Sequence, residues 1–395
     1  MYLKLGLIIM MACMTTVVAA KPQHPLPNPG FEILHPKAPQ VKVLIAKDLF
    51  ETVVEVKGPY KIYDPNEYTL FSTGMFGKCY PVSVSVDGLK WGEEFPGTFQ
   101  IAIVPTNART TTWVDGVCYT GIVYIYGVGN KINIVNQVNV EDFLKETLAA
   151  QYKDNLSDEA LAALAIAART TAYYQAERYN DAFYQYDAEA VSYSGLSGLK
   201  KKGVDRAVNA TRYLVMRQND KEAYKGLFAA TWTAHCAGRS ASAKSIFRKE
   251  TSGPSGAVES ALAASDRDNV SWTYMVRKGD LAKMVGATQI SGLTAYTDQA
   301  SGKVYAVRLQ SGDGNREMDF TSLQTLLGAD KLQSSDFAIS NDKDIITFTG
   351  YGKGHGTGLC LYTACKMAEH GLDAVKVLRK FFPGTEVVMM PLLPK

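Results

Sequence analysis

The feature that most constrains this fold is a change in the spacing of the apolar residues near residue 139. From about residue 41 to residue 138, apolar and polar residues alternate in runs rich in Val, Ile, Tyr and Thr. This alternation indicates β-strands that bury one face, and the turn residues between the runs indicate hairpins. The runs are VKVLIA, TVVEVKG, VSVSVDG, FQIAIVP, GIVYIYG and KINIVN, and the turns are Asp87-Gly88, Asp115-Gly116 and Gly129-Asn130.

Beyond residue 139 the apolar residues recur at helical spacing. Asn139 is a candidate N-cap, and Glu141 and Asp142 follow in the first turn, where acidic side chains are favoured by the helix dipole. A second helix is expected from Ser157 to about Tyr179, because this stretch is rich in alanine. The rest of the chain mixes both patterns, so the sequence predicts an α+β protein. Further strands are expected near 213–216, 227–232 and 344–348, and further helices near 280–285, 321–327 and 359–370.

The N-terminus has the pattern of an export signal. Lys4 precedes an apolar run that ends at Cys13, and small residues at 18–20 provide a cleavage site. We therefore expect residues 1–20 to be a signal peptide and residues 21–40, with six prolines, to be an extended leader. A soluble exported protein is favoured over a lipoprotein anchored at Cys13, because the residues before this cysteine match a lipobox poorly. No later apolar segment is long enough to span a membrane.

Charge and cysteine content exclude some classes of protein. The net charge is +3, and removal of the signal peptide takes away only Lys4 and leaves +2, so binding to nucleic acid is not expected. Five cysteines remain after cleavage, and an odd number cannot form a complete disulfide framework. Cys79 and Cys118 lie in β-patterned sequence, where they either pair with each other or remain buried thiols.

A run of alternating glycines, TGYGKGHGTG, occupies residues 349–358. It lacks the spacing of a P-loop and of the dinucleotide-binding fingerprint, and it lies too near the C-terminus to open a βαβαβ unit. Two explanations remain open. The run either presents backbone N–H groups to an anion or polar group at a helix N-terminus, or it is a tight turn whose glycines let two backbones approach each other.

Two long motifs resemble the stage II sporulation protein D family (SpoIID/LytB). The stretch GYGKGHGTGLCLYTACKMAEHG, followed by VLRKFFPGTEV, is similar to the family's C-terminal signature. VNVEDFLKETLAAQYKDNLSDEALAALAIAARTTAY is similar to its helical signature, and TWTAHCAGRSASAKSIF is a weaker third match. The motifs follow the family's order, so we expect a β-rich N-terminal region at 41–110 and a SpoIID/LytB-like domain with a groove at 111–390.

The resemblance implies an exported protein of the periplasm or cell envelope that acts in cell-wall remodelling, in sporulation or in cell division. Family members cleave peptidoglycan glycan strands as lytic transglycosylases, often on strands stripped of stem peptides, or they enhance a partner amidase. The cleavage needs one carboxylic acid, which protonates the glycosidic oxygen and then accepts the proton of the C6 hydroxyl of N-acetylmuramic acid. The product is a 1,6-anhydro sugar, and no metal or organic cofactor is implied.

This chain departs from the family at the position of that acid, which is Gln151 here. An amide donates hydrogen bonds, but it cannot give up and recover a proton near neutral pH. Glu146 is five residues away on the same helix and is expected on a different face. Glu141 and Asp142 match family positions of their own, although the helix dipole explains them equally well. Arg169 is expected to be buried and to pair with one of these two acids, or to be purely structural.

The other candidate site residues come from the two C-terminal motifs. The family's histidine in the third motif is Thr233 here, and His235 is a candidate to take its place. A metal site at His235 and Cys236 is a weak alternative, because no second pair of ligands lies nearby in the sequence. His355, in the glycine run, is expected to face Gln151 across one saccharide groove. Predicted substrate-binding residues are Tyr193, Trp232, His235, Tyr351, Gly354 and Gly356, although a single aromatic residue is more often part of a core.

Three functions are compatible with these residues. The first is a lytic transglycosylase whose acid is displaced or weakened, which the family favours and which we take as the expected function. The second is a glycan-binding protein that recruits or stimulates an amidase or another hydrolase, and Gln151 favours it. The third is a structural envelope protein, which the retained polar residues His355 and Arg169 argue against.

Overall fold

The structure is a computed structural model that describes residues 39–152, 156–198, 200–218, 226–248, 253 and 256–390. The predicted signal peptide, Cys13 and nearly all of the predicted leader lie outside these residues. The described residues divide into two compact units. The N-terminal unit holds the described parts of 39–152 and 172–213, and the C-terminal unit holds those of 156–171 and 214–390. Helix α2 (Asp158–Arg178) contributes residues to both.

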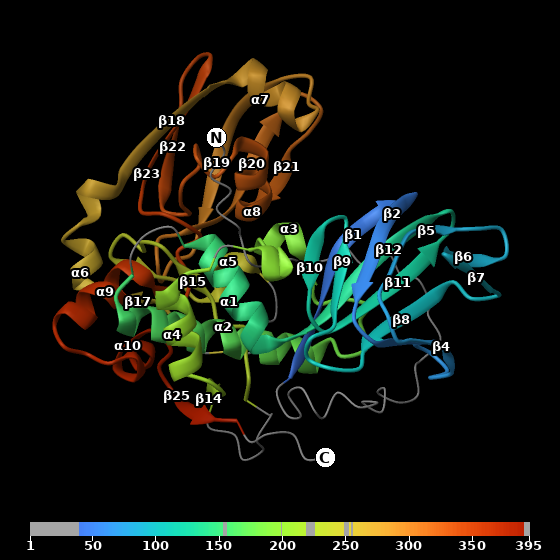
Figure 1. Ribbon diagram of the computed structural model, residues 1–395. Helices are drawn as coiled ribbons and strands as arrows, with labels where there is room; N and C mark the ends of the chain where they lie inside the picture. Colours follow the sequence, from blue (N-terminus) through green and yellow to red (C-terminus); the bar gives the residue numbers. More distant parts are fainter. Residues whose placement is uncertain are drawn as a thin grey trace. The chain divides into compact units, whose positions relative to one another are not determined.

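Two sheets of mainly antiparallel strands make up most of the N-terminal unit (Figure 1). The larger sheet has the strand order β13-β1-β12-β11-β8-β3-β4, and the smaller has the order β10-β9-β2-β5-β6-β7. The larger sheet consists of β1 (Gln40–Leu49), β3 (Tyr60–Tyr63), β4 (Leu70–Gly74), β8 (Gln100–Pro105), β11 (Ile122–Val128), β12 (Lys131–Asn139) and β13 (Tyr186–Asp187). The smaller consists of β2 (Glu51–Lys57), β5 (Lys78–Val84), β6 (Gly88–Trp91), β7 (Glu93–Pro96), β9 (Thr111–Val114) and β10 (Val117–Tyr119).

The two sheets pack face to face through large apolar side chains. Trp91 of the smaller sheet is fully buried, and its ring centroid lies 5.9 Å from that of Tyr60 in the larger sheet. The Trp91 indole N–H donates to the carbonyl oxygen of Val54 at 3.0 Å, which satisfies its polar atom. Apolar residues also cover the other face of the larger sheet, where Ala102, Val104 and Tyr124 belong to a second buried cluster.

The helices of the N-terminal unit are α1 (Val140–Gln151), α3 (Ala188–Val191) and α4 (Lys202–Ala210), together with the 3₁₀ turn η2 (Gly195–Ser197). The Asn139 side chain accepts a hydrogen bond from the Glu141 N–H at 2.8 Å, so the predicted N-cap is confirmed. All six alternating runs contain strands, and each predicted turn pair joins two of them. Strand β5 ends at Val84, earlier than expected, because Ser85 N donates to Gly88 O and the chain turns there.

The C-terminal unit has a part built around α2 and short strand pairs. Strand β14 (Leu214–Gln218) pairs with β25 (Thr385–Met389), β15 (Trp232–Thr233) with β24 (Leu359–Cys360), and β16 (Arg239–Ser240) with β17 (Val258–Glu259). Its helices include α5 (Ala243–Phe247), α6 (Ala261–Ala264), α9 (Leu361–Glu369) and α10 (Ala374–Phe381). Glu159, in the first turn of α2, accepts a hydrogen bond from Ala374 N at 2.7 Å and so caps α10.

A small β-domain completes the C-terminal unit. Two three-stranded sheets, β18-β23-β22 and β19-β20-β21, share a core with helices α7 and α8 (Figure 1). Trp272, Phe320 and Phe348 are among its buried residues. The elements are η3 (Arg267–Val270), β18 (Ser271–Arg277), α7 (Lys278–Val285), β19 (Ile290–Thr297), β20 (Val304–Ser311), β21 (Arg316–Asp319), α8 (Phe320–Leu327), β22 (Phe337–Asn341) and β23 (Ile345–Tyr351).

The predicted fold class, α+β, is confirmed, but two details of the prediction differ from the structure. Strands on both sides of residue 110 share one sheet, since β9 pairs with β2, so the compact units do not divide at 110. The expected strand at 227–232 is only β15, because the chain bends before it. Its apolar residues Leu227 and Phe228 are buried without joining a sheet, which explains the misleading pattern.

Strand register excludes a disulfide between Cys79 and Cys118, which was one of the two alternatives for these cysteines. Cys118 is a buried thiol, as the other alternative expects, whereas Cys79 is exposed. Cys79 is opposite Glu55, Glu55 is opposite Trp113, and Trp113 is opposite Cys118. The two cysteines are therefore three strand spacings apart, or about 14 Å. A disulfide requires Cα atoms roughly 4.4–6.8 Å apart, so both remain thiols.

Candidate functional site

Helix α1 carries the residue at the family's acid position. Gln151 is the last residue of the helix and is half-buried. Its side-chain nitrogen donates to the carbonyl oxygen of Val191, at the end of α3, at 3.0 Å. This hydrogen bond orients the amide and joins two segments of the N-terminal unit, which is a role that a carboxylate cannot fill because it has no donor.

The two acids at the start of α1 differ in exposure. Glu141 is 3% exposed, whereas Asp142 is half-buried. Both lie in the first turn, where the helix dipole stabilises negative charge. Their place at the N-terminus of α1 is therefore explained locally, and their role toward a substrate stays a prediction.

Glu146 is a third acidic residue of α1, and its side chain is buried. It is 8% exposed, and its Oε2 atom has no hydrogen-bond partner among the described residues. A Cβ atom built on Gly198 would lie 2.3 Å from this oxygen, so the carboxyl group packs directly against the backbone. Burial is the largest cause that raises the pKa of Glu146, and the nearby Asp205 and Asp142 add to it against Lys200.

The glycine run packs closely against the segment around β15 in the C-terminal unit. Gly352, Gly354, Gly356 and Gly358 all have positive φ angles, between 69° and 98°, which favour glycine. A Cβ atom on Gly358 would lie 2.0 Å from the carbonyl oxygen of Thr231, and one on Gly354 would lie 2.6 Å from Thr233 Oγ1. The alternation of glycine is therefore explained by a close approach to the segment around β15.

Most backbone N–H groups of the glycine run are occupied by hydrogen bonds within the unit and do not form an anion-binding site. Backbone N–H groups at 351–354 and 356–359 donate to acceptors inside the unit, among them Val270 O, Gln333 O and Thr233 Oγ1. A phosphate or other anion would need these groups free. Of the two explanations that remained open for the glycine run, the structure therefore supports a tight turn between close backbones.

His355, within the run, is a buried histidine that stays neutral. It is 7% exposed, and its Nδ1 atom lies 2.7 Å from Thr357 Oγ1 and 3.2 Å from Thr357 N. The ring also makes an edge contact with Phe247. Burial lowers the pKa of His355 to about 4, so the ring carries no charge near neutral pH.

His235 has a carboxylate and an aromatic ring as neighbours. Its Nε2 atom lies 3.3 Å from Asp266 Oδ2, and its ring centroid lies 4.5 Å from that of Tyr362. Its Nδ1 atom accepts a hydrogen bond from Ala237 N at 3.1 Å. Burial lowers the pKa of His235 and outweighs the opposing effect of Asp266. Within the described residues, no group of three or more His, Cys, Asp or Glu side chains is placed to hold a metal ion.

A buried charge cluster, absent from the sequence predictions, supports the loop that carries His235. Lys303 is 1% exposed and donates to Cys236 O and to Asp336 Oδ2, both at 2.7 Å. Arg267 binds both oxygens of Asp336 and also donates to Ala237 O at 2.7 Å. Two cations thus hold consecutive carbonyl groups of the loop. The partners lie far apart in the chain, so no local pattern indicates them.

Arg169 is fully buried on α2, as predicted. Its guanidinium group donates to the carbonyl oxygen of Leu214, the first residue of β14, at 3.2 Å. The expected carboxylate partner, Glu141 or Asp142, belongs to the other unit, and that pairing stays a prediction.

The predicted sugar-binding aromatic residues have different surroundings. Tyr193 is 5% exposed, and its hydroxyl group donates to Asn136 Oδ1 at 2.7 Å within the N-terminal unit. Trp232 and Tyr351 are half-buried in the C-terminal unit, and the Arg267 guanidinium lies 4.0 Å from the Tyr351 ring centroid. The surroundings of Tyr193 are those of a core residue, whereas Trp232 and Tyr351 keep part of their surface exposed.

The predicted residues thus fall into two groups. Gln151, Glu141, Asp142 and Tyr193 lie in the N-terminal unit, and the C-terminal unit contains the others, which are Arg169, Trp232, His235, Tyr351, Gly354, His355 and Gly356. Within the C-terminal unit, the structure brings the His235 loop beside the glycine run, since His235 N donates to Lys353 O at 3.1 Å. The saccharide groove between Gln151 and His355 stays a prediction.

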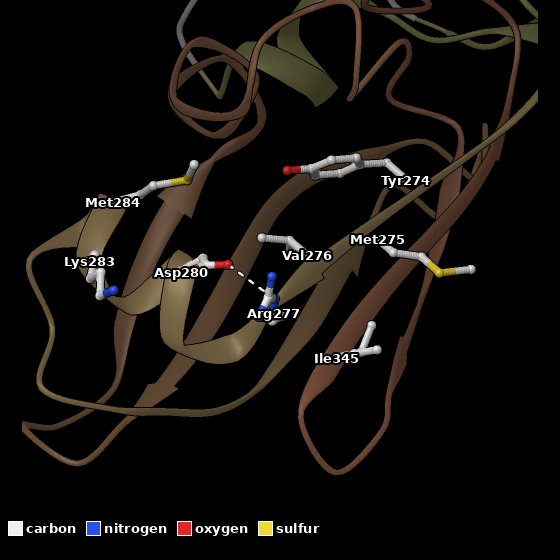
Figure 2. A pocket seen from close by; sticks show the side chains of 8 residues that line it. All are labelled: Tyr274, Met275, Val276, Arg277, Asp280, Lys283, Met284 and Ile345. Atoms are coloured by element: carbon white, nitrogen blue, oxygen red, sulfur yellow. Dashed lines mark ion pairs between the residues drawn. The ribbon is translucent and has the colours of Figure 1, made fainter.

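A separate pocket of about 570 Å³ lies in the small β-domain (Figure 2). It is lined by residues 274–277 of β18, by Asp280, Lys283 and Met284 of α7, and by Ile345. Arg277 pairs with Asp280 at its edge. None of the predicted site residues is among those that line it. Among the described residues, no helix has the length and apolar character needed to cross a membrane.

The structure is that of an α+β protein in which the capped helix α1 and the glycine turn at 349–358 contain parts of two of the sequence motifs. Residues 128–217 match the model of the family SpoIID, stage II sporulation protein. The resemblance seen in the sequence is therefore confirmed for this segment. It contains Gln151 and Arg169, whereas His235 and His355 lie beyond it.

Three relatives extend this comparison. An uncharacterized protein of Brachyspira hyodysenteriae is 28% identical over 344 residues, which cover 85% of this chain and 89% of that protein. An uncharacterized protein of Chlamydia pneumoniae is 33% identical over 181 residues, covering 45% of this chain and 66% of that protein. A protein of Bacillus subtilis named Amidase enhancer is 35% identical over 107 residues, which cover 25% of this chain and 15% of the enhancer.

Proposed function

We propose that this chain is a cell-wall protein that binds peptidoglycan glycan strands, including strands without stem peptides, and recruits or stimulates a wall hydrolase such as an amidase. Its segment that matches the SpoIID family supports a role at the cell wall. Its partial similarity to a protein named Amidase enhancer supports an amidase as the partner. The observation that carries the proposal is the amide at residue 151, held by its hydrogen bond to Val191 O.

The chemistry of the family explains why this amide decides between binding and cleavage. A lytic transglycosylase protonates the leaving oxygen and then removes a proton from the C6 hydroxyl, and one carboxyl group does both. An amide does neither near neutral pH. General acid–base catalysis contributes roughly 10²–10⁴-fold to a rate. Without an acid at residue 151, the chain can still bind strands, but this residue contributes little to their cleavage.

Binding and cleavage are separated by assaying the chain from residue 21 onward on purified glycan strands. We expect wild-type protein to co-sediment with the strands and to raise amidase turnover without releasing 1,6-anhydro-muropeptides. Gln151→Glu restores the family acid and should gain anhydro products, whereas Gln151→Asn, the matched control that keeps an amide, should gain none. Failure of wild type to bind strands, or to stimulate any amidase, would sink the proposal.

A second candidate function, lytic cleavage by the wild-type chain, is favoured by one observation. Glu146 is on the same helix as Gln151 and is a buried carboxyl group with an unpartnered oxygen and a raised pKa. Burial that raises the pKa of a carboxyl group favours its protonated form, and protonation of a glycosidic oxygen requires that form. In this case wild type releases anhydro products, and Glu146→Gln abolishes them while glycan binding is kept.

A further inference from the structure

Two buried cysteines of the C-terminal unit lie against each other although 124 residues separate them in sequence. Cys236 follows β15 and is 1% exposed, and Cys360 ends β24 and is fully buried. The strands β15 and β24 are parallel neighbours in which Thr233 is opposite Cys360. The fold therefore fixes the two cysteines close together independently of any bond between them.

The contacts of the two sulfur atoms are direct. The Cys236 backbone N–H donates to Cys360 Sγ at 3.3 Å, and the Thr363 hydroxyl group donates to the same sulfur at 3.2 Å. A hydrogen bond from the Cys236 thiol to the Cys360 sulfur is the largest cause that raises the pKa of Cys236. Burial raises the pKa of Cys360, but the hydrogen bonds from Cys236 and Thr363 outweigh it and lower the value to about 7. One thiol of the pair is thus the better nucleophile.

We propose that Cys236 and Cys360 form a disulfide bond in the exported protein, made by exchange with a disulfide such as oxidised glutathione. This bond would tie the His235 loop to the segment that follows the glycine run. It goes beyond the proposed function, since it concerns covalent structure and holds whether the chain binds glycan or cleaves it. Oxidising compartments outside the cytoplasm allow such bonds to persist.

The disulfide forms by two successive thiol–disulfide exchange steps, in which atoms and electrons balance. The Cys360 thiolate attacks one sulfur of oxidised glutathione, which forms a mixed disulfide and releases one glutathione thiolate. Cys236 then loses its proton to the solvent, and its thiolate attacks Cys360 Sγ and releases the second glutathione. The protein loses two electrons and two protons, and one glutathione disulfide becomes two thiols. Because both sulfurs are buried, we expect the exchange during folding or local opening.

The other described cysteines have no comparable geometry. Cys79 is exposed, Cys118 is three strand spacings from Cys79, and Cys365 is half-buried on the helix that follows Cys360. These three are therefore built-in controls. A bond between Cys236 and Cys360 also closes a long loop. Closing a long loop lowers the conformational entropy of the unfolded chain strongly, and this stabilises the folded state.

The test refolds the full mature chain in a glutathione redox buffer and, separately, with a reductant. N-ethylmaleimide then labels thiols under denaturing conditions, and mass spectrometry of unreduced peptides locates any cross-link. We expect a peptide pair joined through Cys236 and Cys360, with Cys79, Cys118 and Cys365 all labelled. We also expect the melting temperature to rise by several degrees on oxidation in wild type and in Cys79→Ser. That rise should vanish in Cys236→Ser and Cys360→Ser.

Labelling of both Cys236 and Cys360 after refolding with oxidant would overturn the proposal. A cross-link that involves one of the three control cysteines would do so as well. Because the peptide mapping uses wild-type protein, it decides the question even if either serine variant fails to fold.

Discussion

The Lys303 ammonium group lies 2.7 Å from Asp336 Oδ2, and the lysine side chain is buried almost completely. The same ammonium group donates to the carbonyl oxygen of Cys236, one residue after His235. An ion pair in such surroundings contributes little net stability compared with apolar side chains, but the loss of one partner leaves a buried charge uncompensated. The pair therefore fixes where the His235 loop lies in the C-terminal unit.

Removal of the lysine charge should destabilise the protein strongly. We expect Lys303→Met to cost roughly 3–5 kcal/mol, because Asp336 loses one of its two charged partners and the Cys236 carbonyl keeps the Arg239 N–H as donor but loses the ammonium group. Lys343→Met, at an exposed position, is the matched control and should change stability by about 0.5 kcal/mol or less. Urea denaturation measures both, and equal costs would show that burial of Lys303 is unimportant.

Alanine substitutions at Gly358 and Gly371 should separate the cost of a steric clash from the cost of a left-handed backbone conformation. Gly358 and Gly371 have similar φ angles, 69° and 77°, but only Gly358 has a neighbour that an added Cβ would meet, Thr231 O at 2.0 Å. Gly371→Ala should cost roughly 1–2 kcal/mol for the left-handed conformation alone. We expect Gly358→Ala to cost a further 1–3 kcal/mol or so, since the backbones must move apart. Similar midpoints of urea denaturation for the two variants would contradict this explanation.

The local features of this fold could be predicted from the sequence, because their causes are local. Strand alternation, the hairpin turns and the Asn139 cap depend on residues a few positions apart, and the structure confirms them. Strand β20, VYAVRLQS, also has an alternating pattern, with Val307 and Leu309 buried, and this signal was present but was missed.

The candidate site was less predictable because its contacts connect distant parts of the chain. Lys303 and Cys236 are 67 residues apart, and Cys360 and Cys236 are 124 apart. No periodicity in the sequence reports such a contact. The glycine run shows the same limit, since the sequence left two explanations open and only the position of Thr231 beside Gly358 decided between them.

Protonation of His355 should make the folded protein sensitive to acid. Burial lowers the pKa of His355 to about 4, whereas an unfolded chain has a histidine pKa of about 6.5. Between these values the unfolded state binds a proton that the folded state lacks, so stability falls as pH decreases through this window. The difference corresponds to roughly 3 kcal/mol for this one group.

Variants at two histidines check this pH dependence. His355→Asn places an amide where Nδ1 meets Thr357 and removes the titrating group, so its stability should change less between about pH 6.5 and about pH 4. His370→Asn makes the same substitution at an exposed position and is the matched control. If the free energy of unfolding of His355→Asn falls with acid as steeply as that of wild type, then another group is responsible.

Glu146 should show the opposite dependence on pH. Burial raises the pKa of Glu146 above its ordinary value of 4.5, so the folded state holds its proton at a pH where the unfolded chain has lost it. Ionisation then costs stability as pH rises above about 4.5, and the full cost is present once pH exceeds the folded-state pKa. Glu146→Gln cannot ionise, and we expect it to melt at a higher temperature than wild type near pH 7 but at the same temperature near pH 4. Melting curves across this range measure the difference, and a variant that is less stable than wild type near pH 7 would contradict the buried acid. A stable Glu146→Gln also makes the glycan assay decisive, because any loss of anhydro products could then not be assigned to unfolding.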